Sequence, residues 1–162
     1  MSHISKPQNR SGGRGGSATV EFALVLPLLL ALMFGIIEFG LLFKDQLTIQ
    51  QCAREGARTA AVGKMRSEVN DRVTSSATTL NPSGLTYDVM FRTYDNGVWS
   101  PYATLGDRLD DSGQNDAPTG AQVRVRTNYV HPFSTGSLFS SLIGRPGATS
   151  MTLHAEMVMR RE

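Results

Sequence analysis

Two carboxylates lie in or directly beside a long apolar stretch of the chain. Between Phe22 and Phe43 the only charged residue is Glu38, and Glu21 immediately precedes the stretch. An ionised carboxylate without a partner is strongly disfavoured away from water, so an acid at membrane depth points to an ion pair. We therefore predict that Glu21 and Glu38 take part in charge pairing, between subunits or within the membrane. For Glu38 the alternative is a side chain that reaches up to the membrane surface.

The residues before Glu21 form a recognisable cleavage pattern. Gly16 is followed by four residues, the glutamate and the aromatic Phe22, all behind a short basic leader. This pattern resembles the processing site of type IV prepilins, which implies that a prepilin peptidase cuts between Gly16 and Ser17. The resemblance also implies that Glu21 pairs with the new N-terminal amine of an adjacent subunit. Such an amine has an ordinary pKa of roughly 7.7–8.0 and is largely protonated near neutral pH. The alternative is an uncleaved anchor whose Glu21 is solvated among lipid headgroups.

The apolar stretch itself predicts a membrane-spanning helix. Residues 22–43 would be about 33 Å long as a helix at roughly 1.5 Å per residue, which fits a hydrocarbon core of about 30 Å. The core helix of a soluble protein would show a polar face, and residues 22–37 show none. The stretch is longer than the apolar region of a typical signal peptide, so we expect it to be retained. The basic leader places the N-terminus in the cytoplasm and the rest of the chain outside.

The segments after the apolar stretch predict a helical stalk and a small sheet. We expect a basic cytoplasmic leader at 1–16, a transmembrane helix at 17–43, a helical stalk at 44–80 and an antiparallel β domain at 81–162. In the stalk, small residues recur at helical spacing and predict a face that packs closely against a sheet or a neighbouring subunit. The alternative is that they only reflect the high helix propensity of alanine. The residues are Ala53, Gly56, Ala57, Ala60 and Ala61. Gly63 is the expected end of this helix, and 65–77 the expected second helix.

Beyond residue 84 the hydrophobic pattern has a period of two, which is typical of half-buried strands. Alternation at 85–92, 121–130 and 148–159 predicts three strands, and Asn96-Gly97 predicts a hairpin that leads into another strand from Val98. Four strands with one apolar face need a helix to cover them. The expected fold is therefore α+β and pilin-like: a long N-terminal transmembrane helix whose soluble half packs on a small antiparallel sheet.

Other kinds of chemistry find little support in the sequence. His131 and His154 follow neither a metal-ligand spacing nor a nucleophile motif, and no catalytic residue is assigned. The acidic loop lacks the spacing of a calcium loop and is interpreted as solvated; its acids are Asp107, Asp110, Asp111 and Asp116. Aromatic residues around the hairpin could bind carbohydrate but are interpreted as structural; they are Tyr87, Tyr94, Trp99 and Tyr102. We expect no metal and no cofactor. Cys52 is interpreted as a small buried residue.

The overall charge also limits the choice of partners. The formal net charge is +2, and several of the basic residues, Lys6, Arg10 and Arg14, lie in the leader. The remainder is therefore close to neutral and offers no basic surface for nucleic acid.

Three parts of the sequence resemble a narrower family. They are GSATVEFALVLPLLLALMFGIIEFG at the start, CAREGARTAA in the stalk, and the last strand ending in AEMVMRRE. Together they resemble TadE-like proteins of the tight-adherence (Tad, Flp) pilus system. One departure is Phe22, where a tyrosine often follows the glutamate in that family.

The resemblance implies a non-catalytic minor pilin or pseudopilin that takes part in pilus assembly. The expected location is the bacterial inner membrane, with a single span, before incorporation into a surface pilus. The expected partners are membrane lipid, prepilin peptidase, other pilins and the platform proteins of pilus assembly. The alternative is a membrane-tethered extracytoplasmic binding domain that is neither processed nor polymerised.

Overall fold

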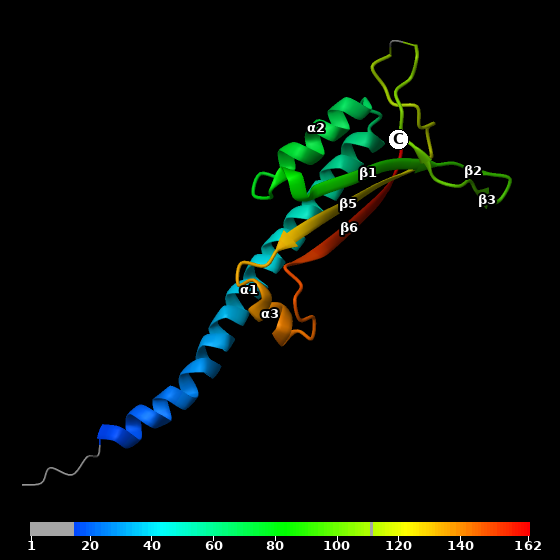
Figure 1. The fold of residues 1–162 in the computed structure, drawn as a ribbon. Helices are drawn as coiled ribbons and strands as arrows, with labels where there is room; N and C mark the ends of the chain where they lie inside the picture. The colour runs from blue at the N-terminus through cyan, green and yellow to red at the C-terminus, as the bar shows by residue number, and fades with distance from the viewer. Residues whose placement is uncertain (1–14, 111) are drawn as a thin grey trace, which may run out of the picture. The chain divides into compact units, whose positions relative to one another are not determined.

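The structure is a computed structural model that describes residues 15–110 and 112–162, so most of the predicted leader lies outside the described residues. The chain forms two compact units, one that ends at Ile36 and one that runs from Ile37 to Glu162. Helix α1, Gly15–Ala61, contributes to both units and is drawn in blue to cyan in Figure 1.

The first unit consists of the N-terminal part of α1. Its side chains from Ser17 to Phe34 are all exposed, although most are large and apolar. An 18-residue window in this helix reaches a mean hydropathy of 2.5 and is not buried by any other part of the described chain. Pro27 lies inside the helix without ending it. Residues 15–110 and 112–162 thus include one long apolar helix of the kind that anchors a chain in a membrane by a single span.

The second unit combines the rest of α1 with a four-stranded antiparallel sheet. Its strands have the order β4-β1-β5-β6, and a separate two-stranded ribbon joins β2 to β3. The strands are β1 Leu85–Arg92, β2 Tyr94–Asp95, β3 Val98–Trp99, β4 Ala103–Thr104, β5 Gln122–Pro132 and β6 Ser150–Arg160. The helical elements are α2 Arg66–Ser76, the short 3₁₀ turn η1 Pro82–Gly84, and α3 Ser137–Leu142. The predicted α+β fold, a long apolar helix followed by a small antiparallel sheet, is confirmed.

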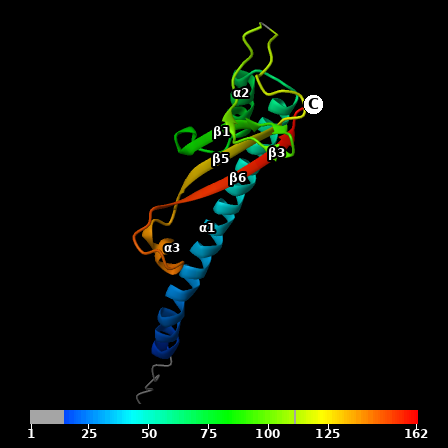
Figure 2. The same ribbon diagram turned by 90° about the vertical axis from the view of Figure 1, so that its right-hand side faces the viewer.

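The sheet buries one face against α1, and its strand register follows the predicted alternation. On β5, Val123, Val125, Thr127 and Tyr129 are buried, whereas Arg126 is exposed. The buried Thr127 hydroxyl donates to the carbonyl of Ile49 in α1, 3.0 Å away. Figures 1 and 2 both show the C-terminal half of α1 running along the sheet, with α2 beside it. The core of the second unit therefore lies between this half of α1, α2 and one face of the sheet.

The predicted small-residue face near the C-terminal end of α1 lies in this core. Ala53, Ala57, Ala60 and Ala61 are buried, as is Gly56, and Cys52 is fully buried among them. Burial raises the pKa of the Cys52 thiol, so the neutral thiol is the stable form inside the fold. Gly56 is the point of closest approach, because a Cβ built there would lie 2.5 Å from Cγ2 of Val73 on α2 and 3.4 Å from Cγ1 of Val125 on β5.

Replacing Gly56 with alanine is expected to lower the free energy of unfolding by about 1–3 kcal/mol, because the new methyl group overpacks the contact with Val73. Thermal unfolding of the full chain in detergent micelles measures the effect. Gly40→Ala is the matched control: a Cβ there meets no heavy atom within 4 Å, so the same change in the same helix should raise stability by up to about 1 kcal/mol. Equal shifts for both variants would contradict the packing at Gly56.

The hairpin is confirmed as a turn, but the strand after it does not join the main sheet. Asn96 and Gly97 have positive φ angles of 48° and 85°, as a tight hairpin turn requires. The expected strand from Val98 pairs only with β2, and β4 instead adds to the edge of β1. The physical reason lies at the base of the hairpin. There the backbone N–H of Ser100 donates to the carbonyl of Thr93, and the next residue, Pro101, has no backbone N–H with which to continue the strand pairing.

The acidic loop between β4 and β5 uses its carboxylates to hold backbone. Asp107 accepts from the backbone N–H of Arg66 at the start of α2, and Asp116 accepts from that of Gly106. The side-chain and backbone hydrogen bonds that Ser112 donates to Asp110 lower the pKa of that carboxyl group. Asp111 lies outside the described residues. The described acids of this loop therefore act as turn and cap residues.

Candidate functional site

Glu38 is a fully buried carboxylate on the part of α1 that belongs to the second unit. Its side chain has no exposed surface, although its neighbours Phe39 and Ile37 are exposed. One oxygen, Oε1, accepts from the backbone N–H of Ser134 at 3.0 Å. The other, Oε2, accepts from the backbone N–H and the hydroxyl of Thr135 at 3.1 and 3.0 Å. The turn after β5 therefore wraps around this carboxylate and replaces the water it has lost.

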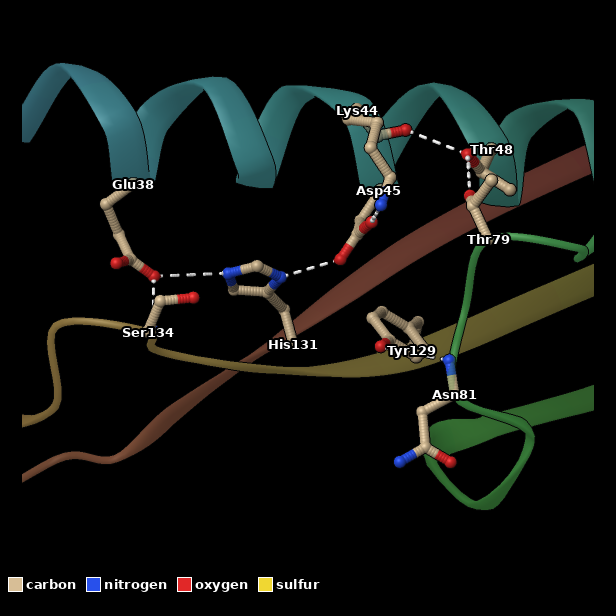
Figure 3. Close-up of polar contacts among 9 residues, drawn as sticks. All are labelled: Glu38, Lys44, Asp45, Thr48, Thr79, Asn81, Tyr129, His131 and Ser134. Atoms are coloured by element: carbon tan, nitrogen blue, oxygen red, sulfur yellow. Dashed lines mark hydrogen bonds and ion pairs between the residues drawn. The ribbon is translucent and has the colours of Figure 1, made fainter.

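A histidine bridges Glu38 to a second buried acid, Asp45. The Nε2 atom of His131 lies 3.3 Å from Oε1 of Glu38, and Nδ1 lies 2.7 Å from Oδ2 of Asp45. The two acids are seven residues apart on α1, which puts them two helical turns apart on one face, about 10 Å along the axis. Figure 3 shows the imidazole ring of His131, from the end of β5, lying between the two carboxylates below the helix.

The charges of this cluster determine what it can do. Each ring nitrogen of His131 lies within hydrogen-bonding distance of one carboxyl group, so this one side chain links both acids. Lys44 lies at the edge of the cluster, with its Nζ 3.2 Å from Oδ1 of Asp45. The ammonium group of Lys44 places a positive charge beside the acids. We call Glu38, Asp45 and His131 the carboxylate clasp, because they fasten β5 to α1.

The clasp has no features of a catalytic centre. All three side chains are almost completely buried, and each ring nitrogen of His131 faces a carboxylate rather than a hydroxyl or thiol nucleophile. His154, the other histidine of the second unit, is exposed and contacts Oδ1 of Asn128 at 2.7 Å. Strand pairing places His154 opposite Asn128 and His131 opposite Met151, and only His131 lies on the buried face of the sheet. The structure does not bring the two histidines together.

The structure gives Glu38 partners that sequence reasoning missed. Within the described chain the partners of Glu38 come from the turn after β5, and Lys44 contacts Asp45. Two signals could have identified the clasp. Glu38 and Asp45 share the helix face that leads into the buried small residues, and His131 has the same parity along the strand as the inward-facing Val125.

The predicted processing junction lies in the first unit, on exposed helix. Gly16, Ser17 and Glu21 are all exposed, and the Ser17 hydroxyl donates to Oε1 of Glu21 at 3.3 Å. These residues are neighbours because a helix places residues four apart on the same side. The Glu21 carboxylate is therefore directed toward the residue that would become the N-terminus after cleavage.

The remaining candidates have structural contacts. The guanidinium of Arg92 lies over Trp99 and over Tyr102, 4.7 Å from each ring centroid, and Arg124 lies 3.5 Å from that of Tyr102. Tyr94 packs against Trp99 with centroids 4.9 Å apart. These contacts occupy ring faces that a sugar would need. In residues 15–110 and 112–162, no group of three or more histidine, cysteine or acidic side chains could hold a metal ion.

Comparison with known families agrees with the pattern of the N-terminal helix. The family model for TadE-like proteins matches residues 16–58, from the predicted processing glycine to Arg58 in the buried part of α1. Neither the curated proteins nor the solved structures include a match to this chain. The resemblance expected from the sequence is thus confirmed over residues 16–58, and this segment, which carries Glu21, Glu38 and Asp45, is similar to TadE-like proteins.

Proposed function

We propose that this protein is a non-catalytic minor pilin or pseudopilin that takes part in assembling a Tad-type adhesive pilus. The observation that carries the proposal is the extent of the family match, which begins at Gly16 and continues through the exposed apolar helix into the packed half of α1. A chain of this kind sits in the inner membrane by one span, with the leader in the cytoplasm and the sheet outside. Its partners are membrane lipid, a prepilin peptidase, other pilins and the assembly platform.

Glu21 has the central role in this proposal. Cleavage after Gly16 makes Ser17 the N-terminal residue and creates an amine. In a bundle of apolar helices, the Glu21 carboxylate of one subunit pairs with the amine of the next, because both groups lose water and each relieves the other. A pair that forms at only one axial offset fixes the register between helices. The exposed apolar side chains of residues 17–36 supply the rest of the contact.

N-terminal sequencing of protein extracted from membranes tests the processing step. A mature end at Ser17 supports the proposal, whereas an intact leader supports the alternative of an unprocessed, membrane-tethered binding domain. Gly16→Leu should retain the leader because a large side chain replaces the residue before the cut. Gly40→Ala, in the same helix but away from the junction, should be processed like the wild type.

Replacing Glu21 with alanine should leave membrane insertion intact, because the helix becomes more apolar, but should reduce incorporation into pili at least about tenfold. A loss of 1.4 kcal/mol from the pairing is sufficient for a tenfold change. Immunoblots of sheared pili against total membrane protein measure the ratio. Glu21→Gln is the matched control for shape: it keeps the hydrogen-bonding oxygen and loses the charge, so it should resemble alanine. Normal pilus yield from both variants would refute the pairing role.

A further inference from the structure

The second unit has an apolar groove between α1 and α3. It encloses a volume of about 290 Å³ and is lined by Phe39, Phe43, Phe139, Ile143 and Met151 among others. Phe39, Phe43 and Ile143 are 54%, 64% and 40% exposed, which is unusual for such large apolar side chains grouped on one surface. The only polar lining residue is Gln46, and its amide already donates to the carbonyl of His154 at 3.0 Å.

The clasp and contacts between aromatic rings hold α3 against α1 beside the groove. Glu38 binds the two residues that precede α3, Ser134 and Thr135. Phe139 of α3 then packs edge-on against Phe39, with centroids 6.0 Å apart, and also against Phe133 at 5.4 Å. Segment 133–143 is therefore held against the first turns of α1 that follow the exposed apolar helix.

The apolar α1 residues that line the groove lie within the apolar stretch 22–43 that predicts a membrane span; they are Phe39, Leu42 and Phe43. The next residue of α1 is the exposed cation Lys44, and the exposed Arg145 follows α3. Aromatic and apolar residues followed by Lys and Arg are typical of the layer where hydrocarbon meets headgroups.

From this position in the apolar stretch we propose that the groove is a lipid-binding surface, in which α3 and the facing side of α1 enter the outer-leaflet interface and phospholipid acyl chains fill the groove. The only polar side chain in the lining, Gln46, already donates to the carbonyl of His154, so the groove presents an almost wholly apolar surface. Acyl chains need only apolar contact, and Lys44 and Arg145 face the anionic phosphates above them. The inference rests on the membrane anchoring included in the proposed function.

The test uses the full chain in vesicles of phosphatidylcholine and phosphatidylglycerol whose acyl chains carry bromine near the headgroup. The native protein has a single tryptophan, Trp99, in the hairpin. Trp99→Phe removes it, and Ile143→Trp then places a lone probe at the groove. Val62→Trp in the same Trp99→Phe background is the matched control, since Val62 is exposed just after α1 ends.

We expect the probe at 143 to lose about half or more of its emission to the bromines and to shift to the blue, because interfacial side chains reach roughly 5–10 Å into this layer. The probe at 62 should be unaffected. Flotation of the vesicles reports anchoring separately. Protein that floats while the 143 probe remains unquenched would overturn the lipid-binding surface and leave the anchor intact; a blue shift without quenching would mean that the probe is buried against protein and would overturn it too. Protein that does not float would overturn both proposals.

Discussion

Replacing His131 with leucine should lower the free energy of unfolding by about 2–6 kcal/mol, because two buried carboxyl groups each lose a hydrogen-bond partner at a cost of roughly 1–3 kcal/mol. Leucine fills much of the volume of the imidazole but offers Glu38 and Asp45, buried on the same helix face, no hydrogen-bonding group. Chemical unfolding of the full chain in detergent micelles, followed by Trp99 fluorescence, measures the loss.

Two further variants show whether the loss comes from the uncompensated carboxylates. His154→Leu removes the exposed histidine of the neighbouring strand and should change stability by less than about 0.5 kcal/mol. Adding Asp45→Asn to His131→Leu removes one buried negative charge and should recover part of the stability, because the two sites are coupled. Strictly additive effects of His131→Leu and Asp45→Asn would contradict the coupling of the two residues within the clasp.

Replacing Arg161 with leucine should destabilise the second unit by about 3 kcal/mol or more, since each buried acceptor left without a donor costs roughly 1–3 kcal/mol. The buried guanidinium donates to the carbonyls of Asn115 and Ala117, to the side chain of Asn115, and to Oε1 of Gln114. Burial lowers the pKa of Arg161, with a smaller contribution from the nearby charge of Arg108. The same unfolding measurement detects the effect.

The controls for Arg161 separate its hydrogen bonds from its charge. Arg161→Lys keeps a positive charge but lacks the planar fork that reaches several acceptors, so it should restore little of the stability. Arg160→Leu, at the exposed neighbouring position, should be close to neutral. Full stability in Arg161→Lys would show that charge alone is sufficient and would refute the role of the hydrogen bonds.

The carboxylate clasp and the hydrogen bonds around Arg161 and Asn115 hold the second unit together near the two ends of the packed part of α1. The clasp holds the end of β5 at Glu38 and Asp45. Beyond the other end of the helix, Asn115 donates to the carbonyls of Ala60 and Lys64, and the guanidinium of Arg161 packs against Gly63, whose φ of 92° turns the chain. A cation and donors at a helix C-terminus also compensate its partial negative charge. In the proposed role, force applied to the helix during assembly would reach the sheet through these polar contacts.

Local patterns in the sequence were sufficient for much of the fold. The apolar stretch, the small residues ending at Ala61, the stop at Gly63 and the alternation over 85–92 each report a local preference for helix or strand, and the structure has these elements. The hairpin turn followed from Asn96-Gly97 because few residue pairs adopt two positive φ angles. The predicted processing junction is also a local signal, because Gly16, Ser17, Glu21 and Phe22 lie close together in the sequence.

The tertiary structure alone determined which residues far apart in the chain contact each other. Glu38 was recognised as an acid in need of a partner, but that partner, His131, lies 93 residues further along, and only the folding of β5 onto α1 brings them together. The same holds for Arg161 and Asn115, and for the groove formed where α3 returns to Phe39. Periodicity describes which face of an element is buried. Which buried groups meet depends on the register and position of elements in space, and these are set by packing over the whole unit.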